Sequence, residues 1–70
     1  MTKPTIHAIV DDEPRELPGG GYIVIVKGQG PHAHLVREIV VDVDQAQDRD
    51  RAAMVAIGTF VHLVEAGDLR

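Results

Sequence analysis

His32 and His34 are the residues whose spacing comes closest to that of a metal site. Residues two apart in an extended segment point to the same side, so both imidazoles could bind one zinc or other divalent ion. A third ligand would have to come from His7, from His62 or from the acidic run 11–13. The two histidines alone would be only half of a metal site. The alternative interpretation is that they lie at a hairpin tip in contact with water. A metal- or small-ligand-binding module stays as an alternative, and the main interpretation includes no cofactor.

Carboxylates occur close together at 11–13, at Asp42 and Asp44, and at Asp48 and Asp50. General acid–base catalysis needs two such groups facing each other across a pocket. These are predicted instead on a turn, on a strand exit and on an exposed helix start. Cysteine and serine are absent from the chain, so the two commonest nucleophiles are missing. We therefore predict that the protein is not an enzyme.

Glycines cluster at 19–21 and 28–30, but no Gly-Lys-Ser/Thr motif and no helix start follow them. We interpret them as turns rather than as a phosphate-binding loop. The chain carries 7 Lys and Arg against 11 Asp and Glu, a formal charge of -4, which disfavours direct contact with nucleic acid. An acidic surface could instead face a basic groove of a protein. The best such cluster is Asp42, Asp44, Asp48 and Asp50.

The length of 70 residues predicts a single small domain, residues 1–70, with a limited hydrophobic core. No cysteine is present to form a disulfide, which favours an intracellular protein. No apolar run approaches the roughly 20 residues that span a bilayer, and the N-terminus lacks the apolar core of a signal peptide. We expect a soluble cytoplasmic protein that does not associate with membranes.

The hydrophobic pattern predicts strands over 5–10, 22–27 and 35–43 and a helix over 45–66. The predicted fold is α+β, a three-stranded antiparallel sheet followed by one C-terminal helix (βββα). Asp44 is the expected N-cap of the helix, with Gln47 three residues later, and Gly67 is the expected left-handed residue after its end. The predicted core face of the third strand consists of Arg37, Ile39, Val41 and Val43.

The predicted sheet and helix carry more apolar side chains than they can bury against each other. The helix carries an apolar arc about twice the ~100° width that suits packing on one sheet. Ile23 and Ile25 point opposite to Tyr22, Val24 and Val26, so the second strand is apolar on both faces. One helix covers one face of a sheet, so we expect a second copy or a partner protein on the other. The predicted interface residues are Ile23, Ile25, Val40, Ile57, Phe60 and Leu63.

The segments 4–10, 21–26 and 37–41, followed by a helix rich in alanine and methionine, resemble small phage-encoded anti-CRISPR inhibitor proteins. That resemblance implies binding to a component of the bacterial CRISPR machinery in the host-cell cytoplasm. The chain is also similar to the strand-rich domain of HicB-type antitoxins, which ends in a helix and often dimerises, and this gives a further alternative. We predict a small protein-binding module, a homodimeric inhibitor or regulator of a bacterial protein complex.

Overall fold

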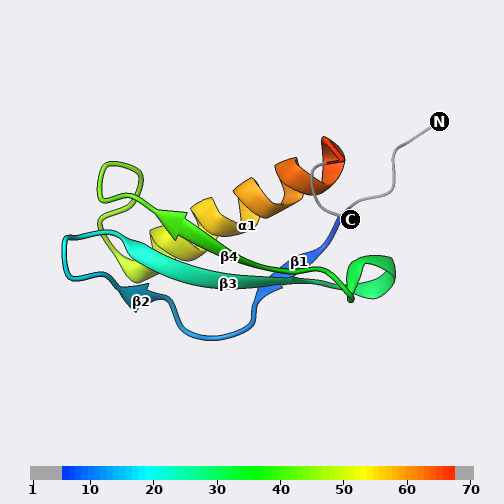
Figure 1. The fold of residues 1–70 in the computed structure, drawn as a ribbon, viewed down its shortest axis with the longest axis horizontal. Coiled ribbons are helices and arrows are strands. Elements are labelled where there is room, and N and C mark those ends of the chain that lie inside the picture. The colour runs from blue at the N-terminus through cyan, green and yellow to red at the C-terminus, as the bar shows by residue number, and fades with distance from the viewer. Residues whose placement is uncertain (1–5, 68–70) are drawn as a thin grey trace.

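The computed structural model describes residues 6–67, which form an antiparallel sheet with one helix across one of its faces (Figure 1). The longest strand is central: two short strands follow one another along one of its edges, and a fourth strand pairs with the other edge. This confirms the predicted α+β class, with four strands rather than three. The elements in chain order are β1 (Ala8–Val10), β2 (Arg15–Glu16), β3 (Tyr22–Gly28), β4 (Val36–Val41) and α1 (Arg49–Glu65).

The additional strand, β2, arises because the first edge of the sheet is interrupted at 11–14. Val10 stands opposite Val26 and Arg15 stands opposite Ile23, so four residues of the first segment match two of β3. Three charges and a proline without an N–H group make these four residues poor ladder partners. The first segment thus has two residues more than β3 over this stretch. Because two is an even number, the side chains that point to a given face of the sheet in β1 keep the same alternation in β2. The sequence analysis placed 15–16 in a polar connection and missed this strand.

The hairpin between β3 and β4 contains one turn of 3-10 helix, η1 (Gly30–His32). Gly28 permits it, because a Cβ atom on this residue would lie 2.2 Å from the His32 carbonyl oxygen. The Gly28 N–H donates to the Leu35 carbonyl at 2.9 Å and so closes the hairpin. His32 therefore lies in a helical turn, and the extended geometry expected for His32 and His34 is wrong.

Several strand boundaries differ from the predicted ones. The strand expected over 5–10 is β1, which begins only at Ala8: Ile6 and His7 lie outside it, and Thr5 lies outside the described residues. The strand expected over 35–43 ends at Val41, because the Asp42 N–H turns to the Gln45 side-chain oxygen at 3.1 Å. Val43 is consequently outside the sheet and 52% exposed, not on the core face. Arg37 keeps its predicted side of the sheet, but its side chain is exposed.

The helix begins four residues later than predicted. The N-cap is Asp48, whose Oδ1 accepts a hydrogen bond from the Arg51 N–H at 2.8 Å, so the assignment of this role to Asp44 is wrong. Residues 42–46 instead form a tight turn, in which the Asp42 carbonyl accepts from the N–H groups of Gln45 and Ala46. The predicted end is confirmed, since Gly67 follows the last helical turn with φ +79°.

The core lies between α1 and the face of the sheet that packs against it. Phe60 is its largest fully buried side chain, and it continues a helical line that begins with Ala52 and Ala56. Ala46 is also buried, but from the turn before the helix rather than from the helix itself. The buried residues are Val24, Val26, Leu35, Ile39, Val41, Ala46, Ala52, Ala56 and Phe60.

Replacing Gly21 by alanine is expected to destabilise the fold. Gly21 has φ +82°, and a Cβ atom there would lie 2.6 Å from the Val41 carbonyl oxygen. The left-handed backbone alone costs a non-glycine residue about 1–2 kcal/mol, and the clash adds to this cost. Urea denaturation of Gly21→Ala should show the loss. Gly19→Ala is the matched control, because a Cβ atom at Gly19 meets nothing within 4 Å. Equal stability of the two variants would contradict this account.

Candidate functional site

The face of the sheet opposite α1, here called the outer face, is the most distinctive surface of the molecule. Val24 and Val26 are buried against the helix, so the alternate residues of β3 point to the outer face. The pairing registers extend this face onto the neighbouring strands. Its residues are Ile9, Arg15, Ile23, Ile25, Lys27, Val36, Glu38 and Val40.

The outer face is apolar and open. Ile9, Val36 and Val40 are 43%, 46% and 56% exposed, while Ile23 and Ile25 between them are half-buried. No helix or strand among residues 6–67 covers this face, since α1, the only α-helix of that range, lies on the other side of the sheet (Figure 1). Aliphatic side chains from three strands therefore form one continuous surface in contact with water.

A small hollow of about 90 Å³ lies in this face. Ile23 and Ile25 give it an apolar lining, and Glu13, Arg15 and Glu38 give it charged groups. Arg15 is already engaged, because its Nη2 lies 3.4 Å from the Asp12 Oδ2. Within the described part of the chain, neither Glu13 nor Glu38 forms an ion pair. An apolar lining with two unpaired carboxylates suits a cationic side chain with an aliphatic stem.

The six residues predicted to form an interface do not lie together. Ile23, Ile25 and Val40 are on the outer face, whereas Ile57 and Leu63 are half-buried against the core on the helix side. Phe60 has no exposed surface at all, so it belongs to the core and offers nothing to a partner.

The outer face also contains two apolar residues that the sequence analysis did not select, Ile9 and Val36. Val36 shares the strand alternation of Val40 and could have been found from it. Ile9 needed the pairing of β1 with β3, which places it opposite Lys27. The apolar surface is thus larger than predicted on the sheet and smaller than predicted on the helix.

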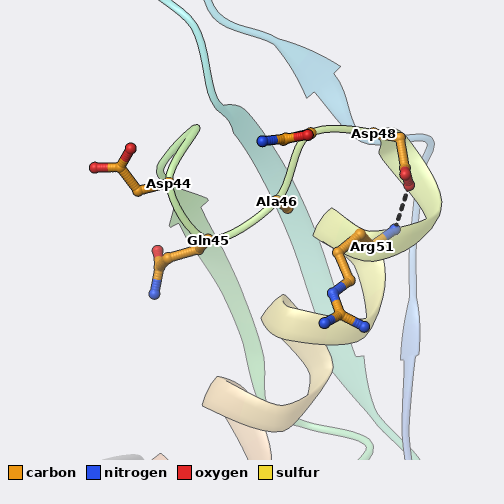
Figure 2. Close-up of a pocket in the computed structure, with 6 residues that line it drawn as sticks. Asp44, Gln45, Ala46, Asp48 and Arg51 are labelled. Carbon is orange, nitrogen blue, oxygen red and sulfur yellow. Dashed lines mark hydrogen bonds between the residues drawn. The ribbon is translucent and has the colours of Figure 1, made fainter.

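The four acidic residues predicted to share a surface, Asp42, Asp44, Asp48 and Asp50, are all exposed near the junction of β4 and α1. Asp44 and Asp48 line an open hollow of about 390 Å³ together with Arg51 (Figure 2). The Asp48 carboxylate accepts from the backbone N–H of Arg51, and the guanidinium of Arg51 points away from that carboxylate.

Asp50 faces a different side of the helix start. It lines a second open hollow, of about 520 Å³, together with Asp12, Glu13 and Arg49. Asp44 and Asp48 therefore lie on one concave surface and Asp50 lies on another, and each surface also contains an arginine. No polar or charged side chain among residues 6–67 is buried, so these carboxylates remain in contact with water.

The histidine pair lies at the far end of the hairpin. His32 ends η1 and is half-buried, whereas His34 is exposed in the following turn. Among residues 6–67, no three His, Asp or Glu side chains come close enough together to hold a metal ion. The third ligand considered in the sequence analysis is thus not supplied by any described residue.

Comparison with known proteins gives no relative for this chain: no protein family, no curated protein and no solved structure matches it. Within residues 6–67 the structure contains no helix of the length and apolar character needed to cross a membrane.

Truncation of Asp48 is expected to destabilise the helix, whereas truncation of Asp44 is not. Loss of an N-cap side chain costs about 0.5–2 kcal/mol, and the Asp48 carboxylate is the group that accepts from the Arg51 N–H. Asp48→Ala should lower the thermal midpoint measured by circular dichroism. Asp44→Ala removes the same charge from the same hollow and should leave the midpoint almost unchanged. The reverse order would reinstate Asp44 as the cap.

Proposed function

We propose that this protein is a small protein-binding module and that the outer face of its sheet is the binding surface. The observation that carries the proposal is the exposure of Ile9 on β1 and of Val36 and Val40 on β4, the two strands that flank β3. Contiguous apolar surface of this kind on a small protein marks a site of association. The face is also built on regular strands, so it is presented without rearrangement of the backbone.

The form of this function that we favour is inhibition or regulation of a bacterial protein complex. The resemblance to small phage-encoded anti-CRISPR proteins supports it, and so does the acidic balance of -4. Carboxylates at the start of α1, with Asp44 and Asp50 on its two sides, would attract a basic partner during encounter.

A photo-crosslinking amino acid placed on the outer face tests the proposal. Introduced at Val40 in bacterial cells that express the protein, it should give one dominant adduct, either with a second copy or with another protein. The matched control is His62, an exposed residue of the helix, which should give no dominant adduct. Absence of an adduct from position 40, or equal labelling from both positions, would refute the proposal.

A further inference from the structure

We propose that the occupant of the outer face is a second copy of this chain, joined face to face about a two-fold axis, with Lys27 of each copy seated at the charged hollow of the other. This inference rests on the proposed function, because it uses the same surface. It is carried by the distribution of charge and apolar side chains on that face.

The charges of the outer face are separated along β3. Lys27 lies at one end, between Ile9 of β1 and Val36 of β4. The hollow with Glu13 and Glu38 lies toward the other end, over Ile23 and Ile25. Among the described residues Lys27 forms no ion pair, just as the two glutamates form none. One copy therefore presents a free cation and two free carboxylates on the same surface.

A two-fold axis across the strands at the level of Ile25 matches these groups. Here a level is a row of residues that stand side by side on paired strands. The axis places Ile25 of one copy against Ile25 of the other, and it places the level of Lys27 in one copy over the level of Ile23 in the other. Consecutive levels on one face are two residues apart, which is about 7 Å at roughly 3.3 Å per residue. The lysine ammonium can therefore reach the hollow that lies over Ile23 and Ile25 of the other copy. Its aliphatic stem lies on the isoleucines while the ammonium meets the carboxylates.

The same rotation pairs the remaining apolar side chains. Val36 and Lys27 stand at one level of the sheet, and Val40 and Ile23 stand at the level four residues away along the strands. The rotation exchanges these levels, so Val36 of each copy meets Val40 of the other. The two-fold axis also brings the two Glu38 side chains to the same level, and the incoming Lys27 groups offset that repulsion. Two identical surfaces thus become complementary.

The size of the face predicts a weak dimer. Three strands at about 4.8 Å and seven residues at about 3.3 Å give a footprint of roughly 300 Å² per copy. Standard interfaces bury about 800 Å² per partner, and smaller ones are typical of transient complexes. Charge contacts then have a large influence on the dissociation constant.

A charge exchange between Lys27 and Glu38 tests the arrangement. Sedimentation equilibrium of the full chain, followed up to about 1 mM, the weak end of measurable association, should show a monomer–dimer equilibrium. Lys27→Glu and Glu38→Lys should each raise the dissociation constant about tenfold or more, because each replaces two attractive contacts per dimer by repulsive ones. The double variant Lys27→Glu/Glu38→Lys should recover part of the lost affinity, because the exchanged pair attracts again while Glu13 keeps its negative charge.

Glu65→Lys is the matched control, because it makes the same charge change as Glu38→Lys at an exposed position of the helix. It should leave the dissociation constant unchanged, and circular dichroism should show the same fold for all variants. A wild-type monomer throughout the concentration range, or a dimer that neither single variant weakens, would overturn the arrangement. An adduct of position 40 with a different protein would then still support the proposed function. Absence of any adduct would refute both the proposed function and the dimer.

Discussion

One helix covers one face of a sheet, and this constraint governs the rest of the structure. All fully buried large side chains lie between α1 and the sheet, with Phe60 supplying the bulk from the helix and three valines supplying it from the strands. The opposite face has the same strand pairing and similar aliphatic side chains but no layer above it. The molecule is thus a two-layer fold in which one layer is apolar on both sides.

The central position of β3 explains why the outer face is continuous. Every other strand pairs with β3, so the alternate side chains of this one strand set the face of all its neighbours. The interruption at 11–14 adds an even number of residues and therefore does not disturb this alternation. An odd number would have turned Arg15 from the outer face toward the helix. The hollow that Arg15 lines with Glu38 depends on this parity.

The periodicity of the sequence predicted those elements of the fold that depend only on the local pattern of residues. The strands β3 and β4, the helix and its end just before Gly67 follow from alternation, apolar spacing and one glycine. The start of the helix was wrong because Asp44 and Asp48 are both competent caps, and the turn at Asp42 decides between them through its bonds to Gln45. Phe60 was assigned to an interface because a helical wheel shows an apolar arc without showing which part of it meets the sheet. Ile9 required long-range register, which a single sequence does not contain.

The order of the elements has a consequence for folding. All four described strands precede α1 in sequence, so the sheet can pair before Phe60 packs against it. In a sheet that has paired without the helix, both surfaces of β3 contact water, and such an intermediate is prone to aggregate. Packing of α1 then protects one of the two surfaces.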